Sequence, residues 1–322
     1  MNEDLSMLLK NWLPIHSFEE NGMELCKWMY LGNKKFTDPF FEETIIKCRS
    51  LPYNSTLFRS VSSMEILPEW SDNIESLSPT AFIFHVSRCG STLISQLLGL
   101  QPSNIVLSEV PFIDEILRNG FREKVSASSQ VKAAIHFYGA KRDERNRHLF
   151  IKLDSWHVHF YRQLRKIYPQ VPFIMLFRKP DEVIRSHQKR RGLQAVPGLL
   201  EPEIFHLERK EIAEMGQDEY TAKVLESYFS AYLEILKTDR QAIPINYNEG
   251  ALAIVQKIGS LTGLSFSQEE MELMRLRSGF HGKYPEEVFK EPVIESPVPS
   301  YMEKAVALYK AVENMRNATS KN

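Results

Sequence analysis

The stretch AFIFHVSRCGSTLISQLLGL, residues 81–100, decides how this 322-residue chain folds. It opens with a short apolar run at 81–86, passes through a polar turn that contains Gly90, and continues in an apolar pattern with helical spacing. The stretch therefore predicts a buried strand, then a tight loop, then an amphipathic helix near 91–100.

Three further apolar runs follow the same plan and lie at 148–153, 172–177 and 242–247. Helical patterns separate or follow these runs, near 157–167, 181–190, 220–237 and 250–262. Continuous apolar strands that alternate with helices are typical of a parallel sheet buried on both faces. We therefore expect an α/β fold, with a P-loop-like parallel β-sheet flanked by helices. Functional residues in such sheets gather at the carboxyl ends of strands.

The rest of the chain suggests three parts. Residues 1–79 show no strand alternation, and Asp38-Pro39 followed by acidic residues is typical of a helix start. We expect a mostly helical N-terminal extension over 1–79, the α/β domain over 80–295, and a C-terminal linker and helix over 296–322. Segment 191–219 interrupts the alternation, and we interpret it as a cap over the site.

Composition limits the possible functions. The net charge of −1 favours neither nucleic acid nor an anionic membrane, and no apolar stretch approaches the roughly 18 residues that span a bilayer. The acidic start is unlike a secretory signal. Cys26, Cys48 and Cys89 form no CxxC pair, so we expect reduced thiols and a cytoplasmic protein. No second ligand pair accompanies His157 and His159 at zinc spacing, so no metal is expected.

The loop has the chemistry of an oxyanion site. Gly90 lets backbone amides approach an anion, and the N–H groups at a helix start carry partial positive charge. Ser91 and Thr92 can cap the helix and donate hydroxyl hydrogens, while Arg88 adds a full charge. The loop is not a Walker A motif, because Cys89 precedes Gly90 and Ser91 takes the place of the lysine. A strand, a turn and a capping serine without function is the alternative.

The segment SRCGST resembles the donor-binding loop of sulfotransferases that use 3'-phosphoadenosine 5'-phosphosulfate (PAPS). In that family a strand enters a loop of the form Lys/Arg-Ser-Gly-Ser/Thr-Ser/Thr, which holds the 5'-phosphosulfate. The arginine form is typical of tyrosylprotein, carbohydrate and some bacterial sulfotransferases. Arg88, Gly90, Ser91 and Thr92 match this form. Cys89 replaces the usual serine, so the resemblance implies that Cys89 contacts the anion through its backbone amide.

A second segment, PFIMLFRKPDEVIRSH at 172–187, resembles the 3'-phosphate site of the same family. There a strand is followed by Arg-Asp-Pro/Gly and by a helix that carries a serine. Arg178 and Ser186 stand at the matching positions, and a guanidinium can fork two hydrogen bonds onto a phosphate. Lys179 replaces the usual aspartate. The alternative is a strand followed by a solvated basic helix face.

Two weaker resemblances add single residues. Glu109 follows a short strand, at a place where tyrosylprotein and carbohydrate sulfotransferases tend to carry a glutamate. SGFHGKYPEE at 278–287 resembles the C-terminal loop that closes over the nucleotide, which makes Lys283 a candidate ligand. The resemblance as a whole covers about residues 80–290.

The resemblance implies transfer of the PAPS sulfuryl group to a hydroxyl or amine of a small-molecule or peptide acceptor. Adenosine 3',5'-bisphosphate is then the product, and no metal takes part. Arg88 is the expected cation at the leaving oxygen and Glu109 the expected general base. His85 is the rival base, whereas Lys152 could reach the site or pair with Asp154.

Two other functions remain open at this point. A P-loop kinase-like phosphotransferase would want a loop lysine and a carboxylate that holds magnesium. A non-catalytic nucleotide-binding or interaction protein could use the same scaffold and contact a partner through its N-terminal segment. The sequence does not identify the acceptor.

Overall fold

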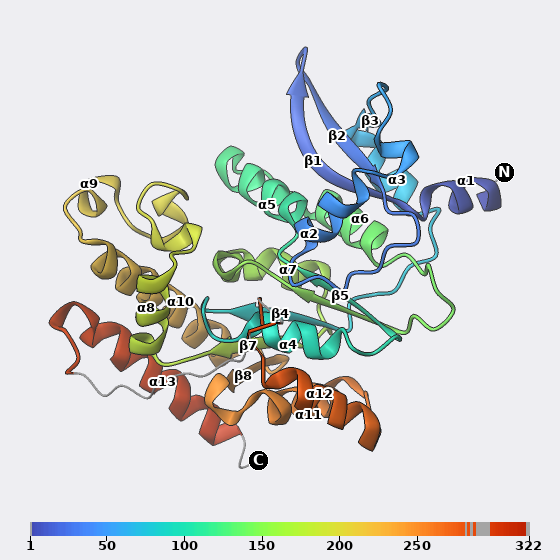
Figure 1. The fold of residues 1–322 in the computed structure, drawn as a ribbon. Coiled ribbons are helices and arrows are strands. Elements are labelled where there is room, and N and C mark those ends of the chain that lie inside the picture. The colour runs from blue at the N-terminus through green and yellow to red at the C-terminus, as the bar shows by residue number, and fades with distance from the viewer. Residues whose placement is uncertain (1, 281, 284–285, 288–296, 320–322) are drawn as a thin grey trace. The chain divides into compact units, whose positions relative to one another are not determined.

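The computed structural model describes residues 2–280, 282–283, 286–287 and 297–319 (Figure 1). A five-stranded parallel sheet has the order β5-β6-β4-β7-β8, and a separate three-stranded sheet has the order β1-β2-β3. The expected α/β fold is confirmed. The strands of the parallel sheet are β4 (Ala81–His85), β5 (Asn104–Ser108), β6 (His148–Lys152), β7 (Phe173–Phe177) and β8 (Ala242–Asn246).

The chain divides into two compact units, which are described one at a time. Unit 1 comprises residues 1–81, 95–152 and 163–171, and unit 2 comprises residues 82–94, 153–162 and 172–322. The sequence boundaries at 79/80 and 295/296 stay predictions.

Unit 1 contains an antiparallel hairpin that the sequence did not lead us to expect. β1 (Trp12–Glu20) and β2 (Met23–Tyr30) are joined by Asn21 and Gly22, both with positive φ, and β3 (Val61–Ser63) pairs with β2. The expectation of a mostly helical segment over 1–79 is therefore wrong. A register shift between Pro14 and His16 breaks the alternation along β1, which hides the strand pattern.

Helices pack against this small sheet within unit 1. The Trp28 ring meets the Phe137 ring edge-on at 4.8 Å, and the Tyr138 hydroxyl donates to the Pro14 carbonyl at 2.5 Å. The helix start expected just after Asp38 and Pro39 lies at Phe41, with Glu42 and Glu43 in the first turn. The Asp38 carboxylate accepts from the Thr44 hydroxyl at 2.9 Å. The helices of this unit include α1 (Asn2–Leu9), α2 (Phe41–Cys48), α3 (Leu67–Ser71), α5 (Pro111–Glu123) and α6 (Ser128–Tyr138).

Unit 2 contains β4, β7 and β8 in parallel register, with Phe82 opposite Phe173 and Phe173 opposite Ala242. Every residue of β4 and β7 is buried, as the continuous apolar runs predict. The helices that follow the strands are α4 (Ser91–Leu98), α7 (Tyr161–Ile167), α8 (Pro180–Lys189), α10 (Gln217–Thr238) and α11 (Ala251–Thr262). Of these, α8, α10 and α11 belong wholly to unit 2, whereas α4 and α7 have residues in both units. The predicted positions of these helices are confirmed to within a few residues, although 155–160 form a 3-10 helix before α7.

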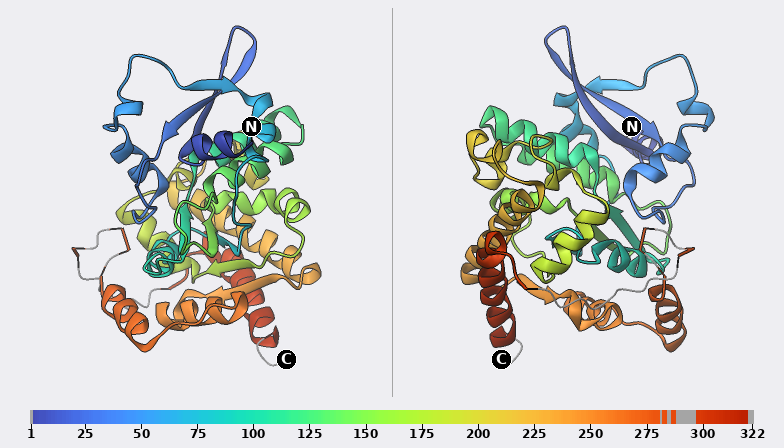
Figure 2. Two further views of the ribbon diagram at one scale, coloured as in Figure 1. Left: turned by 90° about the vertical axis from the view of Figure 1, so that its right-hand side faces the viewer. Right: turned by 60° about the vertical axis from the view of Figure 1, so that its left-hand side comes forward.

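The C-terminal helix α13 (Glu303–Thr319) packs beside α10 (Figure 2). It is also tied to the end of β8, because the Asn246 amide donates to the Tyr309 hydroxyl at 2.9 Å and to Glu313 at 3.0 Å. The closing helix expected near 301–316 is confirmed. Helix α12 (Gln268–Ser278) was not expected from the sequence.

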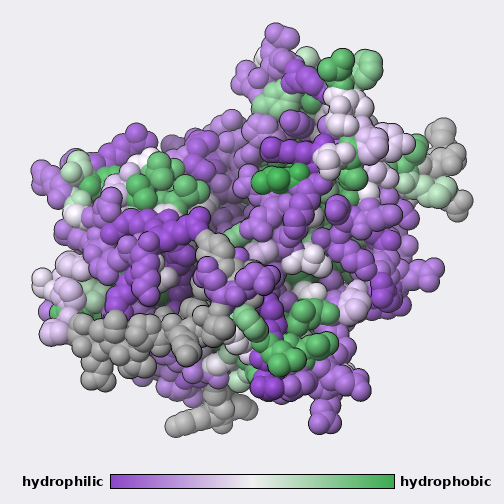
Figure 3. Space-filling view, viewed as in Figure 1, coloured by the Kyte–Doolittle hydropathy of each residue, from purple (hydrophilic) through white to green (hydrophobic). Residues whose placement is uncertain are grey.

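The surface of unit 2 has two apolar areas in the view of Figure 3. One lies over α11 and α12, where the exposed apolar side chains are Leu261, Leu273, Leu276 and Phe280. The other lies over segment 191–219, which is irregular as expected and contains short 3-10 helices and α9 (Arg209–Ile212). Throughout the described part of the chain, every helix is too short or too polar to cross a lipid bilayer.

Candidate anion-binding site

The loop between β4 and α4 has an unusual backbone. Ser87, Arg88 and Gly90 have φ values of 66°, 47° and 74°, in the left-handed region. For residues with a side chain this conformation costs roughly 1–3 kcal/mol, and it persists where the surroundings hold it. The turn leads directly into the first turn of α4, whose N–H groups have no partner within the helix. The predicted strand, turn and helix start are therefore present, and anion binding by this loop stays a prediction.

Gly90 is required for two reasons. Its φ is one that side chains rarely adopt, and a Cβ atom built on it would lie 2.0 Å from Cε2 of Tyr247. The Tyr247 ring therefore rests directly on the loop. The guanidinium carbon of Arg178 lies 5.1 Å from the centre of the same ring, a cation–π geometry.

Ser87 is fixed by a buried polar network. Its N–H donates to Nδ1 of His85 at 3.0 Å, and its hydroxyl oxygen lies 3.3 Å from Nε2 of His187. Nε2 of Gln194 also donates to the Ser87 hydroxyl. His187 and Gln194 were not singled out from the sequence. The role of His85 as a rival base stays a prediction, and in this structure its Nδ1 supports the loop backbone.

Arg88 and Cys89 contact other parts of unit 2. The Arg88 guanidinium donates to the carbonyl of Arg190, just after α8, and the Arg88 carbonyl accepts from Nη1 of Arg178 at 3.4 Å. The Cys89 thiol is buried and donates to the carbonyl of Leu176 at 3.8 Å. The Cys89 side chain therefore faces β7, which fits the expectation that only its amide could serve an anion.

Arg178 stands where β7 ends and is 6% exposed. Its Nε donates to Oε2 of Glu182 at 2.7 Å, one helical turn into α8. The contact between Arg178 and the Arg88 carbonyl brings the two sequence motifs together in one unit. Ser186 follows Glu182 by four residues on α8, so the two share a helix face.

A cluster of cations surrounds the end of α8. The pKa of His187 is lowered to about 3, first by burial and then by the charges of Arg88, Arg191 and Lys283. Lys283 therefore lies in the electrostatic neighbourhood of the anion loop. Residues 281, 284 and 285 of the predicted closing loop lie outside the described residues.

Glu109 belongs to unit 1, where it pairs with Lys152. Nζ of Lys152 donates to the Glu109 carboxylate, and the Glu109 N–H donates to the Lys152 carbonyl at 2.8 Å. Lys152 is 0% exposed, and its ammonium lies 5.0 Å from the centre of the Phe40 ring. The sequence left open whether Lys152 reaches the site or pairs with Asp154. In the structure, Lys152 pairs with Glu109. The role of Glu109 as general base stays a prediction.

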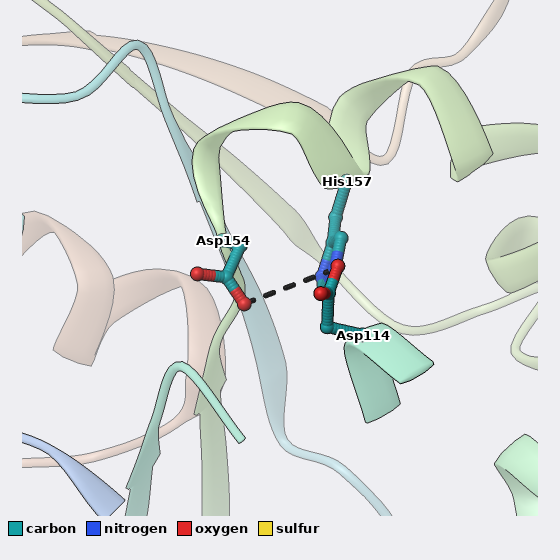
Figure 4. Close-up of side chains that lie close together, drawn as sticks. All are labelled: Asp114, Asp154 and His157. Atoms are coloured by element: carbon teal, nitrogen blue, oxygen red, sulfur yellow. Dashed lines mark ion pairs between the residues drawn. The ribbon is translucent and has the colours of Figure 1, made fainter. Parts of the chain in front are cut away.

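The two histidines of the H-x-H pair, His157 and His159, follow β6 and belong to unit 2. Nε2 of the buried His157 lies 3.8 Å from Oδ2 of Asp154 (Figure 4). His159 instead meets the Ser227 hydroxyl at 3.1 Å through Nε2, and burial followed by the charge of His206 lowers its pKa to about 3. The two histidines of the H-x-H pair thus have different partners. Asp114, also drawn in Figure 4, belongs to unit 1 and pairs there with Arg118 at 3.2 Å.

Comparison with known proteins gives matches among solved structures alone, since no protein-family model and no curated protein matches the chain. A sulfotransferase from Alicyclobacillus acidocaldarius is 14% identical, with a TM-score of 0.43 over 76% of this chain and 96% of that chain. The sulfotransferase domain from the curacin biosynthetic pathway is 15% identical, with a TM-score of 0.48 over 73% of this chain and 99% of that chain.

Mouse sulfotransferase SULT7A1, in a structure complexed with PAP, is 13% identical, with a TM-score of 0.38 over 81% of this chain and 93% of that chain. These three similar structures are all sulfotransferases.

Proposed function

We propose that this chain is a sulfotransferase that moves the sulfuryl group of PAPS to a hydroxyl or amine acceptor. One observation carries the proposal. The left-handed loop at the start of α4 and Arg178 at the end of β7 meet through the hydrogen bond from Arg178 to the Arg88 carbonyl. Two elements that we propose to bind anions are far apart in sequence and in contact in the structure, which suits a donor that carries phosphate groups on both its 3' and 5' positions.

The two elements would divide the donor between them. The amides of residues 89–92 and the hydroxyls of Ser91 and Thr92 suit the 5'-phosphosulfate, since helix starts bind anions. Arg178 suits the 3'-phosphate, because a guanidinium presents five N–H donors in a planar fork that matches phosphate oxygens. Ser186 and Lys283 complete the proposed nucleotide contacts.

Sulfuryl transfer places growing negative charge on the oxygen that leaves with the nucleotide. Fixed cations and amides lower the barrier because they are already oriented toward that charge. Arg88 is the proposed cation, and it would exchange its contact with the Arg190 carbonyl for the leaving oxygen. The acceptor proton would pass to Glu109 or His85. Arginine and amides supply the charge neutralisation, so the proposed reaction needs no metal.

The acceptor surface is proposed to include segment 191–219. Gln194 in this segment touches Ser87 of the loop, and its neighbour Leu193 is 56% exposed. Leu199, a few residues on, is 53% exposed. An apolar surface that begins beside the transferred group favours an acceptor with an apolar body. We also propose a cytoplasmic location, consistent with three buried cysteines that form no disulfide within the described residues.

Calorimetric titration with adenosine 3',5'-bisphosphate, AMP and ATP with magnesium tests the donor assignment. We expect the bisphosphate to bind at least tenfold more tightly than AMP, because each charge-assisted bond to the 3'-phosphate contributes about 1.5–3 kcal/mol. Arg178→Ala should remove this preference, whereas Arg209→Ala, an exposed arginine of the same unit, should not. Tighter binding of ATP with magnesium would instead favour the kinase-like function.

Turnover is tested with PAPS and a panel of alcohols, phenols and amines, with release of the bisphosphate as the readout. Arg88→Ala should abolish transfer while nucleotide binding survives. Wild-type protein that binds PAPS but transfers to no acceptor of the panel would favour the non-catalytic binding protein.

A further inference from the structure

The hydroxyl of Ser87 is held by two donors. Nδ1 of His187 accepts from the Gly192 N–H at 3.3 Å. A neutral imidazole with an accepting Nδ1 carries its hydrogen on Nε2. Nε2 of His187, 3.3 Å from the Ser87 oxygen, is therefore a donor, and the Gln194 amide is a second donor to the same oxygen.

This arrangement requires a neutral His187. Burial and the nearby positive charges lower its pKa to about 3, so the ring stays neutral at the pH of a cell. The protonation state that fixes the direction of the hydrogen bond is thus maintained by the packing around the ring.

Gly192 makes the second contact possible. A Cβ atom at position 192 would lie 2.8 Å from Oε1 and 3.0 Å from Nε2 of Gln194. The Gln194 side chain folds over the glycine and reaches Ser87 through space that any side chain at 192 would take. The absence of a side chain at Gly192 therefore leaves room for the Gln194 amide to contact Ser87.

A hydroxyl whose oxygen accepts two hydrogen bonds still has one hydrogen to donate. Ser87 is the first left-handed residue of the anion loop and precedes Arg88. We propose that Ser87 donates its hydroxyl hydrogen to the anion in the loop, and that His187 and Gln194 are positioning residues that aim it. This inference rests on the proposed function in one respect: the anion is taken to be the 5'-phosphosulfate end of the donor.

Ser87→Gly tests the contact, because glycine tolerates the left-handed backbone and removes the CH2OH side chain with its hydroxyl. The calorimetric probes are adenosine 3',5'-bisphosphate, adenosine 3'-monophosphate and inorganic pyrophosphate. We expect Ser87→Gly to weaken the bisphosphate and pyrophosphate by roughly tenfold or more, the value of a hydrogen bond to a charged group. Adenosine 3'-monophosphate, which lacks the 5' group, should bind as tightly as to the wild type.

The positioning role is tested with a pair of variants at His187. His187→Gln places an amide N–H near the position of Nε2 and should keep most of the bisphosphate affinity, whereas His187→Leu removes the donor and should lose affinity as Ser87→Gly does. Ser260→Ala, which removes an exposed hydroxyl bonded to the Gln256 carbonyl, is the control and should change nothing.

Two results would overturn the proposal. Wild-type affinity of Ser87→Gly for both the bisphosphate and pyrophosphate would show that the hydroxyl does not reach the anion. Equal losses for the bisphosphate and the 3'-monophosphate would show a general disturbance of the nucleotide site. The proposed function fails separately, if wild-type protein binds pyrophosphate through Ser87 but shows no preference for the bisphosphate.

Discussion

Replacement of Gly90 by alanine should be one of the most damaging single-methyl additions in the anion loop. The left-handed backbone, with φ of 74°, costs an alanine about 1–2 kcal/mol. The new methyl group would also lie 2.0 Å from Cε2 and 2.5 Å from Cδ2 of Tyr247, against a normal separation of about 3.5–4 Å. Displacement of the ring adds roughly 1–3 kcal/mol. The total loss in the free energy of unfolding is therefore about 2–5 kcal/mol.

A double-mutant cycle separates the two contributions. In a Tyr247→Ala background the steric part disappears, so Gly90→Ala should cost only the backbone part, about 1–2 kcal/mol. Gly263→Ala is the matched control, because Gly263 has φ of 75° and no atom within 4 Å of its built Cβ. Urea unfolding of the four proteins and the control gives the energies. An equal cost of Gly90→Ala in both backgrounds would refute the steric role of Tyr247.

Three further outcomes follow from the charged and buried groups. His187 and His159 both have pKa values lowered from 6.5 to about 3 in the folded protein. Because the unfolded chain binds more protons below pH 6.5, each histidine should lower the free energy of unfolding by about 2 kcal/mol between pH 7 and pH 5. Urea unfolding measures this change. A pH-independent stability over this range would contradict their burial. Arg178→Lys should weaken the bisphosphate at least tenfold and leave AMP unchanged in calorimetry, because an ammonium lacks the planar fork; similar losses for both ligands would point away from the 3'-phosphate. Glu109→Gln should lower the free energy of unfolding by roughly 3 kcal/mol, because it leaves the buried Lys152 without its carboxylate. Addition of Lys152→Met should recover much of this loss. If urea unfolding shows no recovery, the loss of the ion pair is not the cause.

The parallel sheet was predictable because burial on both faces leaves a local mark. A strand such as β7 is apolar at every position, so five consecutive residues suffice to find it. The β1–β2 hairpin was missed because the irregular register near Pro14 and His16 breaks the alternation on which the prediction relied. Its turn did carry a signal, since Asn21-Gly22 is a preferred two-residue hairpin turn.

In the candidate site too, residues with a local sequence signal could be predicted, whereas contacts between distant residues could not. Gly90 and Arg178 were found because each stands at a fixed offset from a strand end, which the sequence displays directly. The partners of Ser87 were not found, because His187 and Gln194 follow it by 100 and 107 residues. Polar residues on a helix or in an irregular segment carry no local sign that a distant loop will bury them, and tertiary packing alone brings them together.

Helix α8 explains how one loop can keep so many unfavourable backbone angles. Arg178, just before the helix, donates to the Arg88 carbonyl, while His187 in its last turn holds the Ser87 hydroxyl. Arg190, the residue after the helix, accepts from the Arg88 guanidinium. The loop is therefore held from both ends of a rigid ten-residue element about 15 Å long. Because both proposed phosphate contacts depend on this helix, a change in its position would alter the two ends of the donor site together, and their energies should not be additive.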